Sequence, residues 1–193
     1  MDRRIPTRFD PADTSLVLRT DRLRLRPIGE HDANALFAIF SDPEVMRFWS
    51  TPPWTDPAQA LESIRSTRAD YENGSALRLG VEQADRLIGT CTLFAISHGN
   101  RRAEIGYALA RRHWGKGYMH EALAAFVGHA FGALGLHRLE ADIDPRNTAS
   151  ARALERLGFI KEGHLRERWI VAGEVSDSAL YGLLAGDWNR NVR

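Results

Sequence analysis

The sequence is short of cysteine and of net charge. Its single cysteine, Cys91, can form no disulfide within the chain and excludes a metal site built from several thiolates. Cys91 lies among apolar residues, so we expect its thiol to be buried and unreactive. The formal net charge of +1 argues against an overall electrostatic field that would attract nucleic acid.

Long apolar runs and metal-like histidine clusters are also missing. A membrane-spanning helix needs about 18 or more apolar residues in a row, and the chain contains no such run. Residues 1–14 are polar and lack the apolar segment of a signal peptide. The histidines are scattered, without a helical pair beside a carboxylate motif. We therefore expect a cytoplasmic protein that contacts no membrane and holds no metal.

The composition that is present indicates a globular protein. Of the 193 residues, 44% are hydrophobic and 26% are charged, which suits one ordinary domain with a sizeable core. We assign this domain to residues 16–188. The remaining residues would form an N-terminal extension at 1–15 and a C-terminal tail at 189–193.

Hydrophobic periodicity predicts a mixed α/β domain. Alternating or continuous apolar stretches predict strands at 16–28, 77–81, 87–94, 104–109, 137–143, 160–171 and 174–184. Three- and four-residue spacing predicts helices capped by Asp32 and by Asp56, and further helices over 119–134 and 151–157. A strand–helix–strand unit joins 104–109 to 137–143, so these two strands should be parallel neighbours.

A glycine-rich loop joins the strand at 104–109 to the long helix. Gly115 and Gly117 let the backbone approach a ligand closely, and the unpaired amides of the following helical turn favour an anion. A tight turn without a ligand explains these glycines equally well. The two common nucleotide signatures fail, because Ala110 and His120 stand where a P-loop and a dinucleotide fingerprint need glycine. The loop thus suits a pyrophosphate without matching either signature.

Three motifs occur in the order and spacing of one family. The pattern Arg112-x-x-Gly115-x-Gly117 resembles the pyrophosphate motif of GNAT acetyltransferases. The wider stretch 104–122, followed by Asn147-Thr-Ala-Ser150 and Leu154-Glu-Arg-Leu-Gly-Phe159, is similar to the Rim-type branch of ribosomal-protein serine and alanine N-acetyltransferases. The resemblance covers roughly residues 16–188.

This resemblance implies a fold, a cosubstrate and a reaction. The fold would be a single GNAT-like α/β domain, whose mixed sheet of about seven strands splits between strands 4 and 5 and is flanked by helices. Acetyl-CoA would be the cosubstrate, without a metal, and an amine would attack it directly in a ternary complex. The residues implied to contact acetyl-CoA are Ala108, Leu109, Ala110, Arg112, Trp114, Gly115, Lys116, Gly117, Tyr118, Met119, Asn147 and Ser150.

Glu104 resembles the family's general base, which removes a proton from the acceptor amine. It shares a strand face with Gly106 and Ala108, whose small side chains leave room for a ligand. The opposite face, which includes Tyr107, is expected to be core. Partial burial would raise the pKa of Glu104 toward a useful range. The alternative is an edge carboxylate that pairs with a nearby arginine.

Ser150 resembles the proton donor to the departing thiolate in this branch. The helix that often supplies a tyrosine for this purpose has no tyrosine between residues 147 and 158. By the same resemblance, Asn147 would bind the pantetheine amides. Local roles compete with both assignments, because Asn147 can cap the helix and Ser150 lies in its first turn.

The sequence leaves the acceptor open. The resemblance places an early aromatic stretch and the last hairpin around the acceptor pocket, and the candidates to line it are Trp49, Trp54, Trp169 and Asp177. Protein N-termini and small-molecule amines both fit, and a homodimer is common in this branch. A non-catalytic CoA-binding sensor and a nucleotide-binding module are the competing functions.

Overall fold

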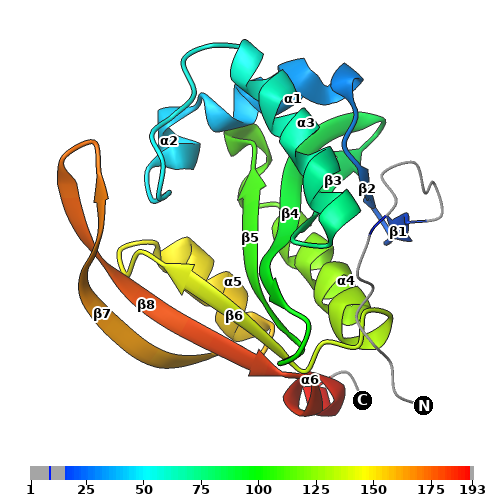
Figure 1. The fold of residues 1–193 in the computed structure, drawn as a ribbon, viewed down its shortest axis with the longest axis vertical. Coiled ribbons are helices and arrows are strands. Elements are labelled where there is room, and N and C mark those ends of the chain that lie inside the picture. Colours follow the sequence, from blue (N-terminus) through cyan, green and yellow to red (C-terminus); the bar gives the residue numbers. More distant parts are fainter. Residues whose placement is uncertain (1–8, 10–15, 192–193) are drawn as a thin grey trace.

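The computed structural model describes Phe9 and residues 16–191 and shows one mixed sheet flanked by helices (Figure 1). The strands are β1 Leu18–Arg19, β2 Arg24–Pro27, β3 Leu77–Gln83, β4 Arg86–Ser97, β5 Arg102–Leu109, β6 Arg138–Ile143, β7 Ile160–Val171 and β8 Glu174–Leu184. The α-helices are α1 Ala33–Phe40, α2 Pro43–Met46, α3 Ala58–Asn73, α4 Tyr118–Gly132, α5 Thr148–Arg156 and α6 Ala185–Asn191. The strand order is β1-β2-β3-β4-β5-β6-β8-β7.

The predicted parallel pairing of the strands that hold Glu104 and Ile143 is confirmed. These strands are β5 and β6, and they form the one parallel pair among the neighbours in the described sheet. The long helix α4 makes the crossover between them. The hairpin β7–β8 turns at Ala172-Gly173 as predicted, and both turn residues have positive φ.

The predicted signals around α3 are confirmed in atomic detail. The Asp56 carboxylate accepts the N–H of Ala58 at 2.8 Å, and Gln59 accepts the N–H groups of Thr55 and Asp56. At the other end, Gly74 takes a left-handed φ of 68° and ends the helix. Helix α3 therefore begins at Ala58, two residues after Asp56, and ends at Asn73, directly before Gly74.

Several boundaries differ from the prediction. The segment 16–28 forms two short antiparallel strands, β1 and β2, so the sheet has eight strands rather than about seven. Asp32 precedes α1 but does not cap it, because its carboxylate is engaged by Arg26 and the N–H of Gly29. Helix α6 crosses the predicted start of the tail at residue 189. Except for Phe9, the predicted extension lies outside the described residues.

Helices cover both faces of the sheet. On one face, α1, α2 and part of α3 form a core cluster with Leu87 and Ala108. On the other, α4 and α5 bury Phe126 and Leu154 against the strands. No helix among the described residues is long and apolar enough to cross a membrane.

The predicted split of the sheet lies between β5 and β6. The two strands are paired only at their beginnings, and the last registered pair is Glu104 with Glu140. Beyond that pair β5 stays with β4 and β6 stays with β8. The strands therefore diverge, and they are fifth and sixth rather than fourth and fifth because segment 16–28 supplies two strands.

Candidate active site

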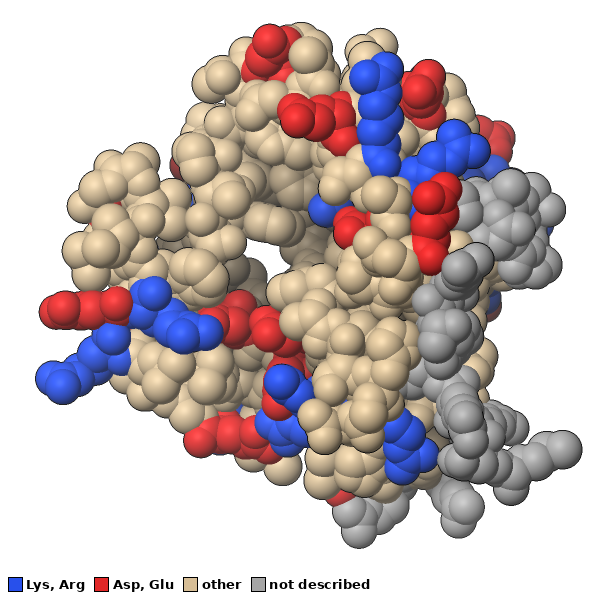
Figure 2. Space-filling model, viewed as in Figure 1, with Lys and Arg blue, Asp and Glu red and all other residues tan. Residues whose placement is uncertain are grey.

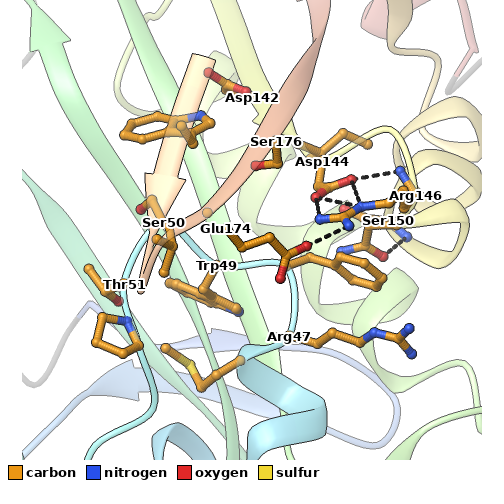
Figure 3. Close-up of a pocket in the computed structure, with 18 of the residues that line it drawn as sticks. Arg47, Trp49, Ser50, Thr51, Asp142, Asp144, Arg146, Ser150, Glu174 and Ser176 are labelled. Carbon is orange, nitrogen blue, oxygen red and sulfur yellow. Dashed lines mark hydrogen bonds and ion pairs between the residues drawn. The ribbon is translucent and has the colours of Figure 1, made fainter. Parts of the chain in front are cut away.

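A cavity of about 380 Å³ opens where β5 and β6 diverge (Figure 3). Its lining comes from β5, β6, the first turn of α5, the loop after α2 and the tip of the β7–β8 hairpin. Figure 2 shows a hollow in the middle of this face, between the hairpin and β5. Both predicted catalytic residues, Glu104 and Ser150, line the cavity.

Glu104 occupies an open face of β5. It pairs across the strands with Phe94 of β4, and Gly106 follows it on the same face. A side chain at position 106 would come within 3.3 Å of the Phe94 ring. Glycine at this position therefore keeps the space beside Glu104 available to a ligand.

The surroundings of Glu104 favour its protonated form. Burial raises the pKa of Glu104 above its ordinary value, and the negative charges of Asp142 and Glu140 raise it further. Arg102 opposes this effect, but its guanidinium is hydrogen-bonded to Glu140 rather than to Glu104. A carboxylate with a raised pKa is suited to take a proton from an amine near neutral pH.

Ser150 is held at the start of α5 by two contacts. The side-chain oxygen of Asn147 accepts the N–H of Ser150 at 3.1 Å, which is a helix cap. The hydroxyl of Ser150 lies 2.6 Å from the hydroxyl of Tyr107 on β5. The cap uses the oxygen of the Asn147 amide and leaves its NH₂ end as a donor for a ligand.

Strand alternation predicts Tyr107 in the core, and the structure shows that Tyr107 also reaches the cavity. Its ring does pack against the main core, but its hydroxyl reaches Ser150 and the residue lines the cavity. The reason is the split of the sheet, which opens the cavity to residues on both faces of β5.

The loop between β5 and α4 has the shape of an anion cradle. Gly115 and Gly117 have φ of 72° and 77°, which glycine adopts most readily. A Cβ at Gly115 would meet no atom within 4 Å, so this side of the loop is open. The first α-helical bond of α4 runs from Glu121 to Gly117, which leaves the preceding amides without helical partners.

Two of the backbone groups predicted to face pantetheine are engaged within the protein. The carbonyl of Leu109 accepts the indole N–H of Trp114 at 2.7 Å. The N–H of Ala110 donates to the carbonyl of Ile88 at 2.8 Å. A cofactor contact from Ala110 would therefore use its carbonyl, whereas the Leu109 carbonyl keeps a second lone pair.

Arg22, in the turn between β1 and β2, contacts this loop, and sequence reasoning missed that contact. Its guanidinium donates to the Lys116 carbonyl at 3.1 Å and pairs with Glu121 at 2.6 Å. It also lies 4.6 Å from the centre of the Tyr118 ring. No local spacing links Arg22 to Glu121, because 99 residues separate them. Tyr118 and Met119, in the first turn of α4, are predicted to contact acetyl-CoA. Both side chains pack against the main core.

Residues 22–160 match the family described as the acetyltransferase (GNAT) domain. The chain belongs to the GNAT acetyltransferase family. The GNAT enzyme is 39% identical to the N-acetyltransferase p20 of Bacillus licheniformis over 173 residues, which cover 89% of this chain and 97% of the relative. It is 29% identical to the [ribosomal protein uS5]-alanine N-acetyltransferase of Escherichia coli over 180 residues, covering 89% and 92%.

Solved structures share the fold. The spermidine N-acetyltransferase of Vibrio cholerae, in complex with CoA and spermine, superposes with a TM-score of 0.79 at 24% identity, covering 88% of this chain and 99% of that one. A GNAT-family acetyltransferase from Bacillus anthracis superposes with a TM-score of 0.78 at 24% identity, covering 89% and 99%. The family and its relatives make this chain an acetyl-CoA-dependent N-acetyltransferase of amines.

Of the four residues predicted to line the acceptor pocket of this GNAT enzyme, two line the cavity between β5 and β6. Trp49 and Trp169 border the cavity, and the indole N–H of Trp169 is fixed by Ser178 at 3.0 Å. Trp54 lies outside the lining because it stacks on Phe40, with ring centres 4.8 Å apart.

Asp177 also lies outside the cavity lining. It braces the β7–β8 hairpin by accepting the N–H of Glu167 and contacting His164, each at 2.8 Å. An acidic residue that the sequence reasoning did not select, Asp142 on β6, lines the cavity instead. Its Oδ1 is buried without a hydrogen-bond partner in the described structure.

An ion-pair cluster lines the cavity in Figure 3. Arg146 pairs with Asp144 and with Glu174 of the hairpin tip, both at 2.6 Å. The Arg146 guanidinium also lies 5.7 Å from the centre of the Phe48 ring. One arginine thereby joins β6, the hairpin and the loop after α2. Only the folded chain brings these segments together.

No group of three or more His, Cys, Asp or Glu side chains that could hold a metal was found in the described part of the chain.

Proposed function

We propose that this enzyme transfers the acetyl group in one step to a small cationic primary amine, with Glu104 as the base and Ser150 as the proton donor. The observation that carries this proposal is the single cavity that both residues line, at the opening between β5 and β6. Direct transfer needs a base on the side of the amine and a donor on the side of the leaving sulfur. The cavity offers both without a covalent intermediate on the protein.

The residues of the β5–α4 loop fit the cofactor that the family uses. Left-handed glycines, an open space in front of Gly115 and unpaired amides at the start of α4 suit a pyrophosphate. Arg112 and Lys116 are exposed on this loop and can add positive charge. When bound, acetyl-CoA supplies the acetyl group as an activated thioester.

Glu104 would remove the proton that an amine carries at neutral pH. An amine with a pKa of about 8–10 is mostly protonated there and cannot attack a carbonyl. The raised pKa of Glu104, caused first by burial, brings the carboxylate closer to the amine in proton affinity. The electron pair of the nitrogen then becomes available for the acetyl carbon.

The cavity lining supports a cationic acceptor with an apolar body. Phe48, Trp49 and Trp169 supply aromatic faces, which attract both apolar groups and cations. The Asp142 carboxylate is paired with Arg168 through Oδ2 at 3.6 Å, while its buried Oδ1 has no hydrogen-bond partner among the described groups and could take one from an ammonium. The cavity volume of about 380 Å³ is in the range of small-molecule pockets. The exposed Arg146–Glu174 ion pair adds charged groups to its lining. Spermidine and a ribosomal protein are the substrates named for two relatives.

An acceptor screen tests this proposal. Candidate amines and short peptides are mixed with acetyl-CoA, and the release of free thiol is followed. We expect small cationic amines to be acetylated faster than peptides, and Asp142→Asn to raise the acceptor KM about tenfold while the acetyl-CoA Kd is kept. A peptide that outperforms every small amine would overturn the acceptor assignment.

The same screen addresses the alternative of a non-catalytic CoA-binding sensor. A sensor would bind acetyl-CoA through the same loop but release no thiol with any amine. We expect turnover, because Glu104 and Ser150 are both present in the cavity.

The homodimer expected from the resemblance stays a prediction. Light scattering would test it, and the exposed edge strand β7, with Ile160 62% and Ile170 72% exposed, is the surface to examine.

A further inference from the structure

Tyr107 contacts Ser150, the proposed proton donor. It lies on β5 and its hydroxyl is 2.6 Å from Ser150 Oγ, across a sequence separation of 43 residues. The next contact of this hydroxyl is the Ser150 carbonyl at 3.4 Å. Either hydroxyl can donate in the 2.6 Å contact, and both neighbours of the tyrosine hydroxyl can accept its hydrogen bond.

The geometry leaves the serine proton for another partner. A serine hydroxyl has one hydrogen to donate and two lone pairs to accept with. If Tyr107 donates to Ser150 Oγ, one lone pair is used and the serine hydrogen points elsewhere. Ser150 lines the cavity, so the remaining direction is toward a ligand in it.

We propose that Tyr107 is a positioning residue that donates a hydrogen bond to Ser150 and orients the Ser150 hydroxyl toward the departing sulfur. This inference rests on the proposed function, in which Ser150 donates to sulfur. A donated bond also polarises the Ser150 O–H group, because hydrogen bonds in a chain strengthen one another.

The transfer step balances with Tyr107 unchanged. The bond from nitrogen to the acetyl carbon forms, the carbon–sulfur bond breaks, and its electron pair goes to sulfur. Glu104 takes one proton from the ammonium before the attack and passes it to solvent. After the attack the nitrogen gives a second proton to Glu104, and the proton of Ser150 goes to sulfur. Glu104 returns this second proton to Ser150 through solvent, so the products are the amide, the free thiol and one proton released to solvent.

Tyr107 stays a donor over the working pH range. Burial raises the pKa of Tyr107 to about 12, and the hydrogen bond with Ser150 opposes this only in part. The phenol therefore keeps its proton near neutral pH. The Tyr107 ring also packs against the main core, so its removal as a whole would disturb packing.

The variant Tyr107→Phe tests the hydroxyl alone, because it keeps the ring. We expect kcat to fall about tenfold, as for one lost hydrogen bond of about 1.4 kcal/mol. The acetyl-CoA Kd and the acceptor KM should stay near their original values, since neither ligand is bound through this hydroxyl. The matched control is Tyr181→Phe, whose hydroxyl contacts Glu155 at 3.4 Å outside the cavity and should leave kcat unchanged.

A double-variant cycle separates positioning from packing. If Tyr107 acts through Ser150, then Tyr107→Phe added to Ser150→Ala should cause no further loss of kcat. Additive losses, or an unchanged kcat in Tyr107→Phe beside a strong loss in Ser150→Ala, would overturn the inference alone. An unchanged kcat in Ser150→Ala would instead remove the donor role of Ser150 and with it the proposed function. Melting curves on each variant confirm that it is folded.

Discussion

Burial and the neighbouring carboxylates Asp142 and Glu140 disfavour the charge on Glu104, and this environment suits the role of base that we propose for it. If it is the base, Glu104→Gln should lower kcat/KM by about 10²–10⁴-fold at pH values between the folded pKa of Glu104 and the pKa of the acceptor, where the carboxylate is ionised and most of the acceptor is protonated. The loss should shrink as the pH rises and free amine becomes abundant. A pH profile of kcat/KM for both proteins checks this, and a small loss of the same size at every pH would make Glu104 structural.

The same substitution should stabilise the fold at neutral pH. Because the pKa of Glu104 is raised by burial, the folded state holds this proton more tightly than the unfolded state does. Its contribution to stability is present below the unfolded pKa of about 4.3 and is lost as the pH rises through the folded pKa. Glu104→Gln should therefore increase the free energy of unfolding at pH 7 and change it little near pH 4, as measured in urea. Glu62→Gln, on the exposed side of α3, is the control and should change neither.

At the residue scale, the sequence placed Glu104 and Ser150 in one site but could not find their partners. Tyr107 was assigned to the core because alternation assumes a closed sheet, and the split exposes both faces of β5. Asp142 gave no signal because a carboxylate next to a strand end is usually solvated. Its unsatisfied oxygen follows only from the way β6 faces the cavity.

At the element scale, the β5–α4 loop depends on its left-handed glycines. We expect Gly117→Val to weaken acetyl-CoA binding by about tenfold or more, because a side chain would stand where the backbone approaches the pyrophosphate. A Cβ at this position would also lie 3.4 Å from the Arg22 guanidinium. Calorimetric titration of the folded variant measures the Kd.

The hairpin glycine provides the control for backbone strain. Gly173 has a φ of 87° and open space around it, so Gly173→Val carries a similar conformational penalty away from the loop. Both variants should lose some stability, and only Gly117→Val should lose acetyl-CoA affinity. Equal affinities in the two variants would contradict the pyrophosphate assignment.

Element boundaries were predictable where local chemistry decides them. The start and end of α3 follow from Asp56, Gln59 and Gly74, whose contacts involve residues close in sequence. Arg22 behaves differently, because its partners Glu121 and Lys116 come from α4 and the loop before it. Such long-range pairs produce no periodic pattern in the sequence. The contact between the β1–β2 turn and the β5–α4 loop was therefore not predictable.

At the scale of the whole molecule, the order of elements was enough to predict the mixed topology. The parallel neighbours β5 and β6 followed from the crossover rule, and the split between them followed from the family resemblance. The eighth strand and helices α2 and α6 were missed because each is short or lies in a segment without periodicity. Both signs of charge are mixed over the surface in Figure 2, which agrees with the small net charge.

A buried ion-pair network links the first helix to the sheet and should control acid stability. Arg26 of β2 holds Asp32 through two hydrogen bonds of 2.7 and 2.8 Å and holds Glu82 of β3 at 2.6 Å. Burial tends to raise the pKa of Asp32, but the hydrogen bonds from Arg26 and from the N–H of Gly29 lower it by more. The folded state therefore favours the ionised carboxylate.

This network gives the last prediction, which concerns the stability of the entire chain. A lowered pKa contributes stability above the unfolded value of about 3.9, and that stability is lost as the pH falls through the folded pKa. Asp32→Asn should cost about 3 kcal/mol of unfolding free energy at pH 7, because it leaves Arg26 buried with half of its partners. The difference from the unchanged protein, measured in urea titrations from pH 7 downward, should narrow as the pH falls below the unfolded value of about 3.9 and through the lower folded pKa of Asp32, where Asp32 becomes protonated in both states. A gap of constant size over that range would show that Asp32 acts through packing, and kcat should be unaffected at pH 7 because Asp32 does not line the cavity.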